Sequence, residues 1–131
     1  MLRQTLLVLT LLCPAASAAD PAPGAPPAKP VPQWVYVLKL VPRLHDDAAW
    51  TKDDERIVGE HFKQLQRMTS ERTLILAGRT TEPGDRTFGL VVFEAADERA
   101  ARAIMESDPA VKGGIMTATL HPYAVALQRT P

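Results

Sequence analysis

The chain has 131 residues, with 15 Lys and Arg against 15 Asp and Glu, so its formal net charge is zero. This balance gives no electrostatic basis for binding nucleic acid or an anionic membrane surface, and we expect neither as a partner. A single cysteine also excludes a framework of disulfides within the chain.

Residues 1–18 have the features of a secretory signal peptide. Arg3 supplies a positive charge, residues 6–12 form a short apolar run, and Ala16-Ser17-Ala18 offers small residues at the spacing that a signal peptidase reads. The apolar run is shorter than the roughly 20 residues that span a bilayer. The sequence therefore predicts cleavage after Ala18, or one residue later, and a periplasmic or secreted protein. Cys13 leaves a lipoprotein alternative, although its neighbours suit lipidation poorly.

The segment after the signal peptide is rich in proline. Residues 20–33 contain six prolines, which disfavour regular hydrogen-bonded structure, so we interpret 19–33 as an extended linker. Removal of Arg3 with the signal peptide leaves 14 basic against 15 acidic residues, a net charge of −1. One domain over residues 34–127 is long enough for a single core, and 128–131 form a tail.

The first half of this domain predicts a strand followed by a helix. Residues 34–40 are rich in β-branched and aromatic residues, and the polar segment 43–47 is expected to be a solvated loop. Thr51-Lys52-Asp53-Asp54 resembles a capping box and predicts a helix that runs to about Ser70. The apolar stripe of this helix comprises Ile57, His61, Leu65 and Met68, with Val58 and Phe62 beside them.

The second half predicts two more strands, a helix and a last strand. Residues 73–77 form a strand that Gly78 should stop, residues 82–85 form a turn, and 88–93 form the returning strand. Asp97 suits the cap of a second helix, which must stop near Asp108 because proline follows. The last strand covers 115–120 and reaches 121–123. The buried side of the second helix is expected to be Ala100, Ala101, Ile104 and Met105.

The order β-α-β-β-α-β predicts an α+β, ferredoxin-like fold, a four-stranded antiparallel sheet with both helices on one face. The other face stays uncovered, yet residues 34–41 are apolar on both sides, with Val35, Val37 and Val41 opposite Trp34, Tyr36, Leu38 and Leu40. An exposed apolar face indicates a partner. We expect a homodimer that packs sheet against sheet around a two-fold axis.

Two polar residues are candidates for a site. His61 lies on the apolar stripe of the first helix, where a buried polar group needs a partner, and Asp108 stands in Asp108-Pro109 at the end of the second. A carboxylate that binds one ring nitrogen fixes the tautomer and raises the basicity of the other. If the fold joins them, His61 is a general acid or base and Asp108 its orienter. Asp108 also suits a turn residue that binds nearby backbone N–H groups.

With these residues in place, the chain resembles the YciI-like (YCII-related) family. The likeness rests on His61-Phe62-Lys63-Gln64-Leu65, Leu74-Ile75-Leu76-Ala77-Gly78, the segment Asp108 to Gly114 and His121-Pro122-Tyr123. It implies a dimeric α/β-barrel protein and an active-site pair at His61 and Asp108. It also implies proton abstraction of the kind used in dehydrochlorination of an aromatic ring, the activity known among relatives. The family often has Gly-Pro after the second strand, where this chain has Gly78-Arg79.

Alternatives remain at the sequence level. His61, His121 and Asp108 are the ligand types of a two-histidine, one-carboxylate metal site, but their spacing is not local, and we expect no metal and no cofactor. Arg43 is a candidate for holding an anion. The principal hypothesis is an enzyme acting on a small organic molecule. Its rivals are a module that only binds a small ligand and a purely structural dimer.

Overall fold

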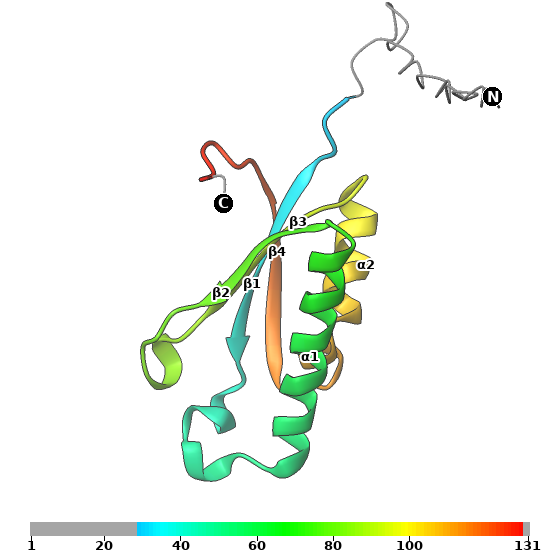
Figure 1. The fold of residues 1–131 in the computed structure, drawn as a ribbon. Coiled ribbons are helices and arrows are strands. Elements are labelled where there is room, and N and C mark those ends of the chain that lie inside the picture. Colours follow the sequence, from blue (N-terminus) through cyan, green and yellow to red (C-terminus); the bar gives the residue numbers. More distant parts are fainter. Residues whose placement is uncertain (1–28, 130–131) are drawn as a thin grey trace, which may run out of the picture.

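The computed structural model describes residues 29–129, and its elements follow the predicted order. The four strands form one antiparallel sheet with the spatial order β2-β3-β1-β4, and the helices lie on one side of it (Figure 1). The predicted α+β, ferredoxin-like fold is confirmed. The expected signal peptide and most of the linker lie outside the described residues. The elements are β1 (Gln33–Leu40), α1 (Lys52–Ser70), β2 (Leu74–Arg79), β3 (Gly89–Glu94), α2 (Glu98–Ser107), α3 (Pro109–Lys112) and β4 (Met116–Tyr123), with short 3₁₀ turns at Pro42–His45, Asp47–Ala49 and Gly84–Arg86.

Helix α1 starts with the predicted capping box. The Thr51 hydroxyl accepts from the Asp54 backbone N–H at 3.2 Å, and the Asp54 carboxylate accepts from the Thr51 backbone N–H at 2.9 Å. Three acidic residues in the first turn suit the positive end of the helix dipole. The helix ends where Arg72 takes a left-handed conformation, with φ of 60°, and Thr73 N–H bonds back to the Met68 carbonyl.

Helix α2 begins and ends where the sequence predicts. The Asp97 side chain caps it by accepting from Ala100 N–H, and the helix stops before Asp108. The chain then makes one further turn, α3, which the sequence analysis did not predict. Asp108 caps this turn in the same manner, by accepting from Ala110 N–H at 2.9 Å.

The prediction that Gly78 stops the second strand was wrong. Strand β2 continues through Gly78 to Arg79, which pair with Leu90 and Gly89 of β3. A glycine weakens a strand but keeps both backbone hydrogen-bonding groups, so pairing continues across it. The extra length carries the β2–β3 hairpin beyond the helices (Figure 1).

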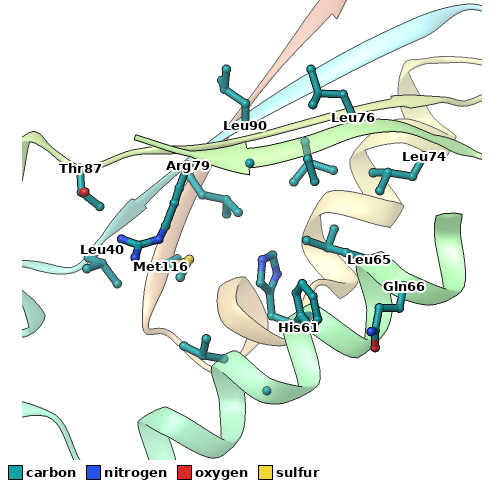
Figure 2. Close-up of a pocket in the computed structure, with 18 of the residues that line it drawn as sticks. Leu40, His61, Leu65, Gln66, Leu74, Leu76, Arg79, Thr87, Leu90 and Met116 are labelled. Carbon is teal, nitrogen blue, oxygen red and sulfur yellow. The ribbon is translucent and has the colours of Figure 1, made fainter. Parts of the chain in front are cut away.

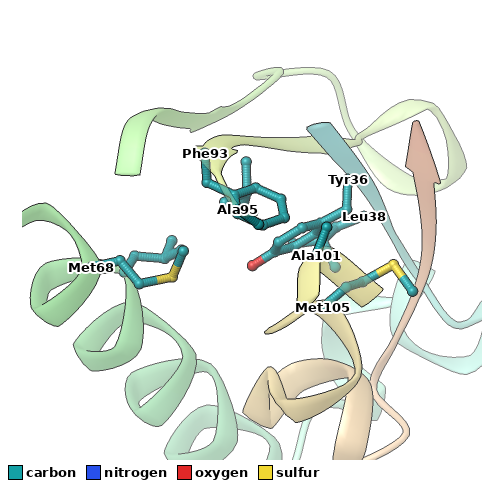
Figure 3. Close-up of a cluster of buried hydrophobic side chains, with 9 residues drawn as sticks. Tyr36, Leu38, Met68, Phe93, Ala95, Ala101 and Met105 are labelled. Carbon is teal, nitrogen blue, oxygen red and sulfur yellow. The ribbon is translucent and has the colours of Figure 1, made fainter. Parts of the chain in front are cut away.

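The main core lies between the sheet and the two long helices. Tyr36 and Phe93 are fully buried at its centre, with ring centroids 5.5 Å apart and planes at 68°, an edge-to-face pair (Figure 3). Leu65 and Met68 of α1 and Ala101 and Met105 of α2 cover these rings, as the predicted stripes require. The complete buried cluster is Tyr36, Leu38, Leu65, Met68, Val91, Phe93, Ala95, Ala101 and Met105.

A smaller cluster corrects the prediction for residues 43–47. That segment is not a solvated loop throughout, because Leu44 is buried against Ala110 and Ile115. The 3₁₀ turn over Pro42–His45 points the Leu44 side chain inward, beneath the start of α1. His45 uses its ring to contact the Leu40 carbonyl, Nε2 to oxygen at 3.2 Å.

The sheet face away from the helices is apolar over its β1, β3 and β2 strands. Val35 and Val92 pair across β1 and β3 and are buried, whereas Leu90 and Leu76 beside them are 36% and 57% exposed. Of the predicted residues, Val37 is partly buried on this face, but Val41 packs into the smaller cluster. We call Val35, Val37, Leu76, Leu90 and Val92 the open-face patch.

Candidate functional site

The structure brings His61 and Asp108 together. Nδ1 of His61 lies 2.8 Å from each carboxylate oxygen of Asp108, although the residues are 47 positions apart. The Asp108 side chain is fully buried, and that of His61 is 12% exposed. His61 lies on the apolar stripe of α1, which faces the sheet. Asp108 directly follows the last residue of α2 and lies beside the His61 ring.

Close packing of α3 against α1 makes this contact possible. A Cβ at Gly113 would lie 2.8 Å from the Pro109 carbonyl oxygen and 3.1 Å from two atoms of the Ile57 side chain. Only glycine fits there without a shift of the backbone. The glycine that follows α3 therefore allows the turn to sit directly on α1, one helical turn before His61.

The Asp108 carboxylate has two further donors. The Tyr36 hydroxyl donates to Oδ2 at 2.8 Å, and the Ala110 backbone N–H donates to Oδ1 at 2.9 Å. Sequence reasoning missed Tyr36, which reads as a core residue of β1. The signal was present, since a buried tyrosine hydroxyl needs a hydrogen-bond partner.

The hydrogen bonds and charges of this network favour an ionised Asp108 and a neutral Tyr36. Burial raises the pKa of Asp108, but hydrogen bonds from His61 and Tyr36, with the attraction of His61, outweigh it, so the net shift is downward. Burial, followed by the charge of Asp108, raises the pKa of Tyr36 far above its usual range. Asp108 is therefore a carboxylate and Tyr36 a neutral donor at neutral pH. In neutral His61, Nδ1 must then carry the proton, leaving the lone pair on Nε2.

His61 borders an open cavity of about 1010 Å³ between α1 and the β2–β3 side of the sheet (Figure 2). This is at the upper end of the roughly 300–1,000 Å³ typical of small-molecule sites. The walls are mostly apolar, and Leu38, Leu65, Leu74, Val91 and Met116 are among them. No described residue bonds Nε2 of His61, so this nitrogen is available to a ligand.

Two other cavity residues were missed from the sequence. Phe62 was placed beside the apolar stripe, but its side chain is 59% exposed at the cavity wall. Arg79, at the end of β2, extends its guanidinium into the space over Leu40 and Met116 (Figure 2). Neither was predictable, because the space itself arises from the way the hairpin diverges from α1.

His121 does not join His61 and Asp108. In β4 it pairs with Val35 and shares the open face with Thr117 and Thr119, whereas His61 and Asp108 lie on the helix side. Within residues 29–129 no three histidine, cysteine or carboxylate side chains are grouped to hold a metal ion.

Arg43 is engaged by the protein rather than directed to the cavity. Its guanidinium donates to both Asp54 oxygens, at 3.1 and 2.5 Å. These bonds, with those from Thr51, hold the pKa of Asp54 well below its usual range. Arg43 therefore locks the start of α1 to the preceding turn.

The fold and site define a small ferredoxin-like domain with a His–Asp pair at the wall of a largely apolar cavity. The sequence profile of the YCII-related domain matches residues 39–120, and the chain belongs to that family. The resemblance proposed from the sequence is thus confirmed. No helix within the described part of the chain has the length and apolar character needed to cross a membrane.

Individual proteins were compared with this chain by sequence and by structure. A search of curated proteins found no match. Among solved structures, the chain is similar to 5-chloro-2-hydroxyhydroquinone dehydrochlorinase from Burkholderia phenoliruptrix AC1100 in complex with 2,5-dihydroxybenzoquinone, at 15% identity and a TM-score of 0.49, over 70% of this chain and 93% of that chain.

Proposed function

We propose that the protein is an enzyme acting on a small organic molecule, with His61 as general acid and base and Asp108 as its orienter. One observation carries this: His61 Nδ1 lies 2.8 Å from both Asp108 oxygens while the same ring borders the cavity. Imidazole gains and loses a proton near neutral pH, and a carboxylate on one nitrogen makes the other a better base.

The reaction that suits this pair is elimination. On a chlorinated hydroquinone, His61 first moves the proton of the ring hydroxyl beside chlorine to the chlorine-bearing ring carbon, which gives the keto tautomer. Nε2 of His61 then takes the proton of the para hydroxyl. The electron pair of that O–H bond forms a C=O bond, the ring double bond shifts, and chloride departs from the sp³ carbon with its bonding electrons to leave the quinone. Such a step needs no oxidant, and it agrees with the dehydrochlorination expected from the family resemblance.

A fold-supporting role for the pair is the specific rival. Asp108 also accepts from Tyr36 and from Ala110 N–H, so its charge contributes to the packing of α3 and β1 whether or not chemistry occurs. The rival predicts that His61 affects stability alone. A third hypothesis is that the protein binds a small ligand in the same cavity without turning it over.

The test is chloride release from a panel of chlorinated hydroquinones by the wild type, His61→Ala and His121→Gln. We expect turnover in the wild type, a loss of at least about a hundredfold in His61→Ala, as is typical of general acid–base groups, and no change in His121→Gln. His121 is the matched control because it lies on the other face of the sheet. Equal turnover in the wild type and His61→Ala would refute the catalytic role.

A substrate-free measurement complements this assay. Nitrogen-15 NMR of the imidazoles should show neutral His61 protonated on Nδ1 in the wild type. In Asp108→Asn the amide presents a donor, and we expect part or all of His61 to change to the Nε2-protonated tautomer. An unchanged spectrum would mean that the charge of Asp108 does not determine the tautomer of His61.

We also propose that the protein is a homodimer, formed through the open-face patch. The patch runs over β1, β3 and β2; its two leucines, Leu76 and Leu90, are 57% and 36% exposed, whereas Val35 and Val92 are already buried. Sheet-on-sheet packing around a two-fold axis would cover these two leucines in both copies.

The location we propose is outside the cytoplasm, on the strength of the charge, apolar run and small residues in 1–18. Production of the full chain in a bacterial host should yield periplasmic protein whose N-terminus is Ala19 or Asp20. Full-length protein confined to the cytoplasm would contradict this.

A further inference from the structure

The cavity beside His61 contains one permanently cationic side chain among its described lining residues, Arg79. We propose that Arg79 binds the anionic group of the ligand, which is therefore a flat, largely apolar organic anion such as an aromatic carboxylate or phenolate. This inference rests on the proposed function, because it assigns the ligand class of the same site.

The position of Arg79 supports this assignment. It ends β2, on the wall opposite α1, and its guanidinium extends into the space over Leu40 and Met116, at the same cavity that His61 borders (Figure 2). No described carboxylate lies within 4 Å of Arg79, which is exposed; the same is true of Arg86 in the same hairpin, but Arg79 is the one described arginine that lines the cavity. A guanidinium free of protein partners presents its fork of N–H donors to a carboxylate or phenolate oxygen.

The rest of the lining indicates what the anion is attached to. Leucine, valine and methionine side chains dominate the walls, so the body of the ligand is hydrocarbon-like. Gly59 of α1 also lines the cavity, and a Cβ there would meet no atom within 4 Å. Space left open on the α1 wall leaves room for a flat ring between the helix and the sheet.

Glu55 is the one described carboxylate in the lining, and it limits where the anion can sit. It lies on α1, six residues before His61 and about 9 Å from it along the helix axis, whereas Arg79 ends β2 on the other wall. Its negative charge disfavours an anion on the α1 side, so the proposed anion binds on the β2 side, at Arg79. The ligand then extends from Arg79 toward Nε2 of His61.

The experiment uses paired aromatic probes and the whole protein. Benzoate and hydroxybenzoates, each with its neutral benzamide counterpart, are titrated by ligand-observed NMR into the wild type, Arg79→Gln and Arg86→Gln. Arg86 is the matched control, because it lies in the same hairpin and carries the same charge but does not line the cavity. Gly59→Leu, which fills the open space on α1, tests whether binding occurs here.

We expect the carboxylates to bind better than their amides and to bind more weakly as salt increases. Arg79→Gln should weaken carboxylate binding about tenfold and leave the amides unchanged, as expected for loss of a charge-assisted hydrogen bond. Arg86→Gln should match the wild type, and Gly59→Leu should abolish binding. Equal binding of acids and amides, no binding of either, or an unaffected Arg79→Gln would overturn the proposal.

The outcomes separate this proposal from the catalytic one. Carboxylate binding that depends on Arg79, together with turnover that ignores His61, would retain the ligand class and refute the catalysis. Turnover that requires His61 but is the same in the wild type and Arg79→Gln would retain the catalytic proposal and refute the role of Arg79 in binding the ligand.

Discussion

Asp108 accepts hydrogen bonds from three separate parts of the chain, the ring of His61 on α1, the hydroxyl of Tyr36 on β1 and the first turn of α3. A buried carboxylate is stable only when such donors replace water. Each hydrogen bond also holds the element that carries its donor. Asp108, the proposed orienter of His61, therefore connects α1, β1 and α3.

Tyr36→Phe tests this connection. The substitution keeps the ring and its contact with Phe93 but removes the donor to Asp108 Oδ2. We expect a loss of about 1.5 kcal/mol in the free energy of unfolding, typical of a hydrogen bond to a charged group. Urea denaturation measures it. Tyr123→Phe, at an exposed position of β4, is the control, and an equal loss there would contradict the assignment.

The Arg43–Asp54 pair predicts a response to acid. Hydrogen bonds from Arg43 and then Thr51 lower the pKa of Asp54 in the folded state, so its stabilising contribution is complete above the unfolded pKa of about 3.9. That contribution is lost as pH falls through the lower, folded pKa. The wild type should exceed Asp54→Asn in stability at pH 7, and the difference should shrink below about pH 4.

Chemical denaturation at several pH values measures this difference. Asp53→Asn is the matched control, since Asp53 is an exposed carboxylate in the same helical turn. A gap between wild type and Asp54→Asn that stays constant from neutral pH into the acid range would contradict the prediction.

At the scale of elements, one glycine at the α1–α3 contact and one glycine of α1 away from it should respond in opposite ways to alanine. Gly113→Ala places a methyl group 3.1 Å from two atoms of the Ile57 side chain on α1, and 2.8 Å from the Pro109 carbonyl of α3, and should cost about 1–3 kcal/mol of stability. Gly59→Ala meets only open space inside a helix and should gain about 0.5–1 kcal/mol. Thermal unfolding of the two variants measures both. A neutral Gly113→Ala would mean that α3 does not press on α1.

The elements themselves were largely predictable from local patterns. The capping box at Thr51, the cap at Asp97 and the stop before Pro109 are decided by neighbouring residues, and the structure has all three. The errors have local causes too. A four-residue helix such as α3 is too short to show a period, and Gly78 weakens a strand without ending its pairing.

The site was predictable only in part. A histidine on an apolar stripe needs a polar partner, and this need, together with the position of Asp108 before Pro109 and the resemblance to the YCII-related family, pointed from His61 to Asp108. The hydrogen bond from Tyr36 to Asp108 depends on how the strands and helices are arranged in space. The same holds for the positions of Phe62 and Arg79 at the cavity. No spacing in the sequence encodes that arrangement.

At the scale of the whole molecule, the open-face patch predicts the state of association. Light scattering at micromolar concentration should give the mass of a dimer for the wild type and of a folded monomer for the double variant Leu76→Lys/Leu90→Lys. Phe62→Lys changes an apolar residue of α1 that lies outside the open-face patch and is about as exposed as Leu76, and it should remain dimeric. A well-folded wild-type monomer would rule out the sheet-to-sheet dimer.

Gly59 has a consequence for how the family should vary. Alanine at that position would make α1 more stable and would clash with nothing, so selection for stability alone favours replacing the glycine. Asp108, by contrast, accepts hydrogen bonds from α1, β1 and α3, so a relative without the proposed activity would still need it. Under the proposed function, a small residue at position 59 should therefore mark ligand-binding relatives better than the His–Asp pair itself.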